Sequence, residues 1–156
     1  MNDAVILQPK SMHRASVIWL HGLGADGNDF APIVPDLELS DELGIRFIFP
    51  HAPKRPVTIN GGMVMRSWYD IKDPDLSQQH DREDFDSSAA ILESWINAEL
   101  AAGIPANRII VAGFSQGGAI TLHCGLVFPK QLAGLLVLSS YLPFIDVIEH
   151  QQAKEN

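Results

Sequence analysis

The strongest chemical signal in the chain is a serine between two glycines, at residues 113–117. Ser115 stands in a G-x-S-x-G motif, which follows a β-branched apolar run and precedes an apolar, helix-like segment that ends before Pro129. This order is typical of a nucleophile elbow, where a serine on a strained strand-to-helix turn exposes its hydroxyl and the glycines allow close packing. The pattern therefore predicts a nucleophilic serine. A plain small-residue connection between strand and helix is the alternative.

A second segment could supply the hydrogen-bond donors that such a serine needs. Residues 16–20 have the pattern of a buried strand that leads into H-G-L-G at residues 21–24. Hydrolases of this type take one backbone N–H from the residue after the nucleophile and one from a loop after an early strand. We therefore expect the N–H groups of Gln116 and Leu23 to form an oxyanion hole. Loss of one such donor typically costs on the order of 3 kcal/mol of activation free energy.

The same loop also fits a different binding motif. Residues 22–27 satisfy G-x-G-x-x-G after a strand, which is the fingerprint of dinucleotide-binding proteins. That fingerprint requires a regular helix opening within the motif, whereas Pro32 and Pro35 permit a short helix at best. The next apolar strand, at residues 45–49, ends in Pro-His without the acidic residue that would hold a ribose. Nucleotide binding is therefore the weaker alternative.

Several motifs, in a fixed order along the chain, resemble one known family. They are HGLGADGNDF at residues 21–30, FPHAP at 49–53 with RPVT at 55–58, SWYD at 67–70, GFSQGG at 113–118 and LSSYLP at 138–143. Together they resemble the phospholipase/carboxylesterase family of α/β-hydrolases, which includes acyl-protein thioesterases. The resemblance implies an α/β-hydrolase fold and a cofactor-free serine hydrolase that cleaves carboxylic esters or thioesters through an acyl-enzyme. It also implies that Ser115 is the nucleophile and that Leu23 and Gln116 form the oxyanion hole.

The chain departs from the family pattern at the catalytic base. In α/β-hydrolases the serine is followed along the chain by an acid and then by a histidine. After Ser115 the histidines are His123, about two turns along the elbow helix, and His150, four residues after Asp146 on an expected surface helix. Neither suits the role, so we expect the triad acid and histidine beyond residue 156. A non-catalytic acyl-binding relative, naturally short and lacking the base, is the alternative.

A strand pattern near the end of the sequence supports the same expectation. Residues 132–138 form a continuous apolar run, typical of a parallel strand covered on both faces. Without a further strand beside it, this strand would lie at an open edge, which promotes aggregation. We therefore expect residues 1–156 to form a single α/β-hydrolase domain that lacks its C-terminal strands.

The remaining patterns position these residues on a mostly parallel central sheet with helices on both faces. Apolar residues recur at steps of three and four from Phe85 to Leu100, which predicts a helix over residues 83–102. Gly103 is suited to a left-handed cap for that helix. Apolar runs predict strands at residues 5–7, 17–21, 45–49, 109–112 and 135–138.

Substrate selectivity is expected in the long connection between the third strand and this helix, because loops on a rigid sheet commonly carry binding residues. Met63, Met65 and Trp68 could line an apolar acyl pocket, and methionine adapts to chains of varied shape. The alternative is that these side chains pack the connection onto the core. His21 and His51 are expected to be hydrogen-bonded loop residues rather than catalytic ones.

Composition and charge narrow the class of protein. The 156 residues are 46% hydrophobic and 19% charged, which suits a packed core and argues against disorder. A formal net charge of −8 disfavours nucleic acid or an anionic membrane as the primary partner. The lone Cys124 excludes a disulfide framework, and no signal peptide or membrane span is recognised, so we expect a cytoplasmic enzyme.

The expected partners follow from the same observations. Asp26, Asn28 and Asp29 lack the ligand spacing of a calcium loop, so no metal is expected, and the family chemistry needs no cofactor. The substrate would be a small-molecule ester, a lipid or an acylated protein. The sequence leaves the oligomeric state open, with a homodimer as one alternative.

Overall fold

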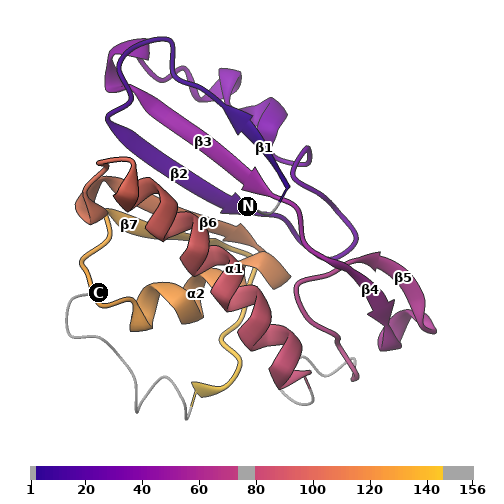
Figure 1. Ribbon diagram of the computed structural model, residues 1–156. Helices are drawn as coiled ribbons and strands as arrows, with labels where there is room; N and C mark the ends of the chain where they lie inside the picture. Colours follow the sequence, from indigo (N-terminus) through magenta and orange to yellow (C-terminus); the bar gives the residue numbers. More distant parts are fainter. Residues whose placement is uncertain (1–2, 74–79, 146–156) are drawn as a thin grey trace.

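The computed structural model describes residues 3–73 and 80–145, and its elements are arranged around a central sheet (Figure 1). This sheet has five strands in the order β1-β3-β2-β6-β7. They are β1 (Ala4–Leu7), β2 (Ala15–Leu20), β3 (Ile45–Pro50), β6 (Ile109–Phe114) and β7 (Gly134–Leu138). Every strand expected from an apolar run is present, with ends that differ from the expected ones by at most two residues.

The pairing of the strands decides which loops meet. β1 is antiparallel to β3, whereas β3, β2, β6 and β7 run parallel to one another. The sheet is therefore mostly parallel, as expected. β2 and β6 are neighbours with Leu20 opposite Gly113, so both strands end at the same edge of the sheet. The loop after β2 and the turn after β6 consequently emerge side by side.

Both faces of β2 and β3 are buried over most of their length, as their continuous apolar runs indicate. Ile18 of β2 belongs to the larger core cluster, which lies under α1 (Arg82–Ala101) and α2 (Gln116–Val127). Trp19 points to the opposite face, where its ring stacks on Phe30 with 4.9 Å between centroids. In the described part of the chain this second face is covered by short 3-10 helices rather than by an α-helix (Figure 1). Ala31 of η1 (Ala31–Ile33) and Val34, which precedes η2 (Pro35–Leu37), pack on this face. The other 3-10 helices among the described residues are η3 (Asp41–Leu43), η4 (Thr58–Asn60) and η5 (Ala106–Arg108).

Defined capping interactions begin and end the long helix α1. The Asp81 side chain accepts a backbone N–H of the first turn. At the other end Gly103 has a φ of +92°, and the Ile104 N–H donates to the Glu99 carbonyl over 3.1 Å. This is the left-handed glycine cap that the sequence predicts. The expected helix over residues 83–102 is confirmed to within one residue at each end.

A two-stranded hairpin in the connection after β3 was not expected. β4 (Lys54–Val57) pairs antiparallel with β5 (Met63–Arg66). Pro56 argues against a strand, because proline has no N–H to donate and is tolerated only at such edges. β5 also lacks the regular apolar–polar alternation that marks a half-buried strand. The hairpin nevertheless reaches the loop after β2, where the Gly24 N–H donates to the Arg66 carbonyl over 2.9 Å.

Among the described residues, β7 pairs with β6 alone and forms one edge of the sheet. The face of β6 and β7 that points away from α2 is also partly exposed. Ile110 and Phe114 of β6 are 37% and 36% exposed, and Leu136 of β7 is 42% exposed. The strand expected at residues 132–138 therefore lies at an open edge in the described structure.

Gly103→Ala should lower the free energy of unfolding by about 1 kcal/mol, because alanine is strained at positive φ. Gly134→Ala is the matched control, because a Cβ at either glycine would meet nothing within 4 Å and only Gly103 has a left-handed φ. The control should be neutral or slightly more stable, since alanine restricts the unfolded chain. Urea unfolding measures both variants, and equal effects would contradict the role of the cap.

Candidate active site

Ser115 occupies a strained turn between β6 and α2. Its φ of +51° and ψ of −118° belong to a region that residues with a side chain rarely adopt. A Cβ on Gly113 would lie 2.4 Å from the Gly117 carbonyl oxygen, so the turn closes only with glycine at that position. Ser115 itself is half-buried. The structure thus places Ser115 on the strained strand-to-helix turn that the sequence predicts.

Two hydrogen bonds hold this turn from the side of β7. The Ser115 N–H donates to the Leu138 carbonyl over 2.9 Å, and the Ser140 hydroxyl donates to the Ser115 carbonyl over 2.6 Å. A Cβ on Gly118 would lie only 2.6 Å from the Ser140 Cβ, so the two segments are in close contact. Sequence reasoning missed Ser140. A pair of serines after an apolar strand was the available signal, and it does not identify a partner 25 residues away.

The loop after β2 lies beside Ser115 at the same sheet edge. A Cβ on Gly22 would be 3.6 Å from the Ser115 Cβ. Among the described residues, neither the Leu23 N–H nor the Gln116 N–H donates a hydrogen bond to another protein group. For Gln116 this follows from its place at the start of α2, where backbone donors have no intrahelical partner. The structure therefore places the loop that carries Leu23 beside Ser115, which directly precedes Gln116, and their role as an oxyanion hole stays a prediction.

His21, which directly precedes this loop, is buried and hydrogen-bonded through both ring nitrogens. Its Nδ1 lies 2.7 Å from the Gly22 carbonyl oxygen, and its Nε2 accepts the Ala52 N–H over 3.0 Å. Because a carbonyl only accepts and an N–H only donates, the ring is the neutral tautomer with its proton on Nδ1. Burial lowers the pKa of His21, which also favours the neutral ring. His21 is thus the hydrogen-bonded loop residue that the sequence predicts.

No described histidine forms a hydrogen bond with Ser115, and the others have different surroundings. His13 contacts Ser16, His51 accepts the Gly27 N–H, His80 packs on the Tyr69 and Tyr141 rings, and His123 meets the Phe85 ring edge-on. Burial lowers the pKa of His123. The expected surface helix with Asp146 and His150 lies outside the described residues.

The three side chains expected to line an acyl pocket occupy different places. Trp68 is fully buried, and its indole N–H donates to the His21 carbonyl over 2.8 Å. Met65 is half-buried beside the loop after β2, with its Sδ 3.7 Å from the position of a Cβ on Gly24. Met63 is 64% exposed on the hairpin. The role of these residues in a pocket stays a prediction.

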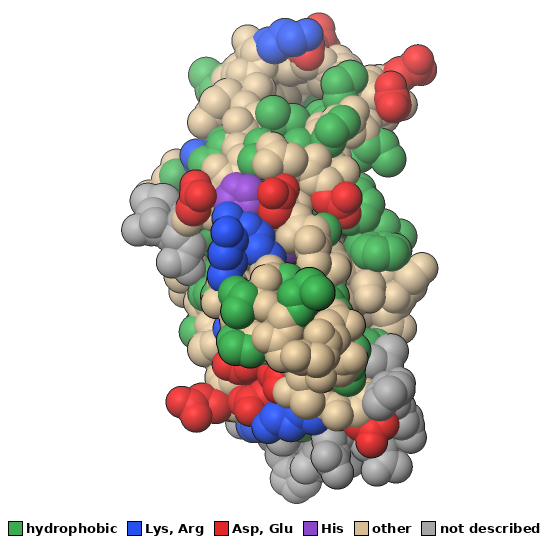
Figure 2. All heavy atoms as spheres, turned by 90° about the vertical axis from the view of Figure 1, so that its right-hand side faces the viewer, with side chains coloured by type: hydrophobic (Ala, Val, Ile, Leu, Met, Phe, Trp, Pro, Cys, Tyr) green, Lys and Arg blue, Asp and Glu red, His purple; other side chains and the backbone are tan. Residues whose placement is uncertain are grey.

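Figure 2 faces the side of the molecule that carries the hairpin, where hydrophobic side chains lie beside basic ones. Ile59, Met63 and Val64 are the exposed hydrophobic residues of the hairpin and its turn. The hairpin borders the loop after β2 through the Gly24–Arg66 hydrogen bond. Exposed apolar side chains of the hairpin therefore lie near the loop after β2.

Comparison with known proteins then decides the family. The sequence profile described as Phospholipase/Carboxylesterase matches residues 1–156. The chain belongs to this phospholipase/carboxylesterase family. It is 42% identical to acyl-protein thioesterase 1 of Yarrowia lipolytica over 98% of this chain and 68% of the relative. It is 43% identical to the acyl-protein thioesterase 1 of Schizosaccharomyces pombe over 90% of this chain and 62% of the relative, so the chain spans about two thirds of these relatives' lengths.

Solved structures of relatives share the fold of this phospholipase/carboxylesterase chain. SOBER1 of Arabidopsis thaliana superposes with a TM-score of 0.84 at 36% identity, over 91% of this chain and 69% of that structure. Acyl-protein thioesterase 2 of Zea mays superposes with a TM-score of 0.82 at 30% identity, over 97% of this chain and 67% of that structure. The α/β-hydrolase fold expected from the sequence motifs is thereby confirmed.

The dinucleotide-binding alternative lacks its structural context in this family member. After the loop at residues 22–27 the chain enters η1 and η2, each of three residues, instead of a regular helix.

The described residues hold no group of three or more His, Cys, Asp or Glu side chains that could bind a metal ion. None of the described helices combines the length and apolar character needed to cross a membrane.

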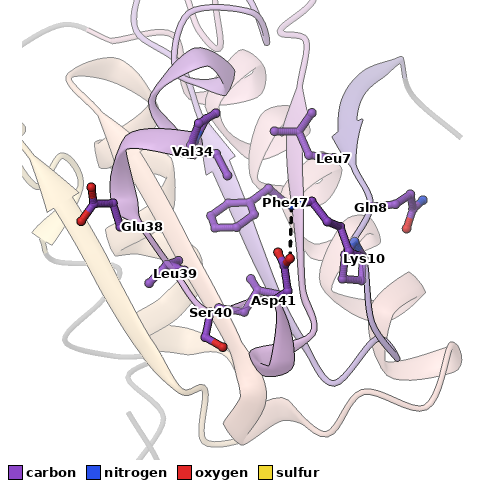
Figure 3. A pocket seen from close by; sticks show the side chains of 12 residues that line it. Leu7, Gln8, Lys10, Val34, Glu38, Leu39, Ser40, Asp41 and Phe47 are labelled. Atoms are coloured by element: carbon purple, nitrogen blue, oxygen red, sulfur yellow. Dashed lines mark hydrogen bonds and ion pairs between the residues drawn. The ribbon is translucent and has the colours of Figure 1, made fainter.

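A cavity of about 360 Å³ lies away from the site, between the end of β1, η2–η3 and the start of β3 (Figure 3). Leu7 and Phe47 form part of its apolar wall, and an ion pair between Lys10 and Asp41, 3.2 Å apart, lies at its rim. The cavity faces the edge where the parallel strands begin, whereas Ser115 follows the end of β6. The cavity therefore takes no part in chemistry at Ser115.

Ser115→Gly should be more stable than Ser115→Ala by about 1 kcal/mol, because glycine relieves the strained φ while both variants remove the hydroxyl. Ser94, exposed in the middle of α1, is the matched control. There the glycine variant should be the less stable of the pair, by about 1 kcal/mol, because glycine weakens a helix. Urea unfolding of the two pairs should give opposite signs, and the same sign at both positions would contradict strain at Ser115.

Proposed function

We propose that this chain supplies the nucleophile and the oxyanion hole of a serine hydrolase that cleaves carboxylic esters or thioesters. The observation that carries the proposal is the position of Ser115 on a strained turn, at the edge that it shares with the loop after β2. The Leu23 and Gln116 N–H groups, free among the described residues, would bind the negative charge that develops on the substrate carbonyl oxygen.

The reaction would proceed through an acyl-enzyme. The Ser115 Oγ forms a bond to the substrate carbonyl carbon while a histidine takes the hydroxyl proton, and the alcohol or thiol leaves with that proton. Water then releases the acid and regenerates the serine by the same route. We place the histidine and its acid outside residues 1–156, because the described histidines are hydrogen-bonded or packed elsewhere and the relatives are longer than this chain.

The relatives named acyl-protein thioesterase favour an acylated protein, joined to its acyl group by a thioester, as the substrate. A small ester and a lysolipid are the alternatives. Rates on an S-acylated peptide, an activated ester and a lysophospholipid would rank them, and the highest kcat/KM should belong to the thioester. A cytoplasmic location and a homodimer stay predictions.

A fluorophosphonate probe should label the complete protein at Ser115, because an activated serine beside two free N–H donors reacts with this electrophile. Ser115→Ala should abolish labelling, whereas Ser94→Ala, which changes an exposed serine on α1, should label as the wild type does. Mass spectrometry of the labelled peptide identifies the modified residue. Labelling of the Ser115→Ala protein elsewhere at an equal rate would contradict the assignment.

A non-catalytic acyl-binding protein is the second candidate, favoured by the lack of any described histidine bonded to Ser115. The two candidates differ in how the complete protein compares with one that ends at Asn156. An enzyme should hydrolyse activated esters when complete and lose most of its activity when shortened. An oxyanion hole and substrate positioning alone accelerate hydrolysis by only about a thousandfold over the uncatalysed reaction in water. A complete protein that binds acyl ligands yet neither labels nor hydrolyses would establish the second candidate.

If Met65 lines the acyl path, Met65→Ala should raise kcat/KM for octanoyl relative to butyryl esters by about tenfold, because it enlarges the space beside the loop after β2. Met12→Ala is the control, since Met12 is 73% exposed near the opposite end of β2. Steady-state rates on p-nitrophenyl esters of increasing length give the ratio. A ratio that stays unchanged in Met65→Ala would remove Met65 from the pocket.

A further inference from the structure

The side chain of Gln116 is buried and fully hydrogen-bonded, although the oxyanion hole uses only its backbone. It is 1% exposed. Its Oε1 accepts the Trp68 N–H over 2.8 Å, and its Nε2 donates to the Tyr69 carbonyl over 2.6 Å. A backbone N–H can only donate and a carbonyl can only accept, so these partners also determine which way the amide points.

Ser67 closes this network. Its hydroxyl donates to the Tyr69 carbonyl over 2.6 Å and accepts the Gln116 Nε2–H over 3.0 Å. The single hydroxyl proton is thereby used, so the 3.3 Å approach of Ser67 Oγ to Gln116 Oε1 adds no further bond. A buried network in which each polar group has its partner holds a single geometry, and removal of one member leaves the others unsatisfied.

The segment that Gln116 holds, residues 67–69, is connected in turn to the loop after β2 at residues 22–27, called the oxyanion loop below because it carries Leu23. The indole N–H of Trp68 donates to the His21 carbonyl over 2.8 Å, and the two rings lie 5.2 Å apart between centroids. The His21 ring is itself fixed by the Gly22 carbonyl and the Ala52 N–H. The carbonyl that accepts this hydrogen bond from Trp68 therefore belongs to the residue two positions before Leu23.

Close packing completes the connection between the two halves of the site. A Cβ on Gly117 would lie 2.5 Å from the His21 carbonyl oxygen, so the start of α2 rests directly against the oxyanion loop. The loop is thus held between α2 and the indole of Trp68. A shift of residues 67–69 would release one of these two supports.

We propose that the Gln116 side chain is a positioning residue for the oxyanion hole, which it acts on through Trp68 and His21 to place the Leu23 N–H opposite the Gln116 N–H. The expected effect on kcat rests on the proposed hydrolase function. The expected effect on the position of the loop rests on the hydrogen-bond network alone. Because the Gln116 N–H belongs to the backbone, side-chain variants retain one donor and test the placement of the other.

The experiment compares three variants of the complete protein with a control at the far end of the sheet. Gln116→Met removes every polar contact of the side chain, and Gln116→Glu keeps its shape. Trp68→Phe keeps an aromatic ring, smaller than the indole, and deletes the bond to His21. Glu99→Gln is the control, because Glu99 is also 1% exposed and accepts bonds from Ser16 and Arg46 where β2 and β3 begin.

In all three variants kcat on an activated ester should fall about tenfold to a hundredfold with KM nearly unchanged, since a displaced donor weakens binding of the transition state more than of the substrate. Gln116→Met and Trp68→Phe together should cost less than the sum of their separate effects, because they break one chain of contacts. The kcat of Gln116→Glu relative to wild type should rise as pH falls, since a protonated carboxyl can again donate to the Tyr69 carbonyl. Glu99→Gln should keep kcat.

Hydrogen exchange separates this inference from the proposed function. Peptides covering residues 22–27 should exchange faster in Gln116→Met and Trp68→Phe, and should be unchanged in Glu99→Gln. If the wild type neither labels nor hydrolyses, the hydrolase proposal fails, and faster exchange still supports the connection from Gln116 to the loop. Unchanged exchange overturns the inference, as does a normal kcat in Trp68→Phe in an active protein. Should Gln116→Met fail to fold, Trp68→Phe and Gln116→Glu decide.

Discussion

The parallel pairing of β2 with β6 is the constraint on which the candidate site depends. With Leu20 opposite Gly113, the two strands end together, and the loop that carries Leu23 emerges beside the turn that carries Ser115. Slippage by one residue would exchange the two buried faces of β2, where Ile18 and Trp19 belong to separate core clusters. The packing of both sheet faces therefore also sets the position of Ser115 relative to the loop that carries Leu23.

That position has a conformational cost, and the structure shows what offsets it. A side chain at the φ and ψ of Ser115 costs on the order of 1–3 kcal/mol. Hydrogen bonds from Ser115 to Leu138 and from Ser140 to Ser115 hold the strained turn against β7. On the other side, the buried amide of Gln116 fastens the turn to residues 67–69. Segments that are distant in the sequence thus keep the serine in a conformation that it would not adopt alone.

The open side of the sheet is consistent with the proposed location of the base. Among the described residues β7 has one neighbouring strand, and Ile110, Phe114 and Leu136 are exposed on the adjoining face. Apolar surface of this kind is normally covered in α/β proteins. Strands added beside β7, and a helix over that face, would provide the cover and bring further loops to the edge where Ser115 lies. We propose that the histidine and its acid stand on such loops.

Most of the fold and the position of the candidate nucleophile could be predicted from the sequence alone. Apolar runs predict every strand of the central sheet, because the strands of a mostly parallel sheet are apolar on both faces, and G-x-S-x-G between strand and helix predicts the turn at Ser115. The hairpin β4–β5 was not predicted because its strands are short, only Val57 among their residues is buried, and Pro56 lies within β4. The tertiary structure alone shows that Trp68 lies behind the loop after β2, and that Ser140 and the Gln116 side chain hold the turn at Ser115 by hydrogen bonds. Their hydrogen bonds join residues 25 to 48 positions apart, and a pattern of neighbouring residues contains no information on pairings that arise only when the chain is folded.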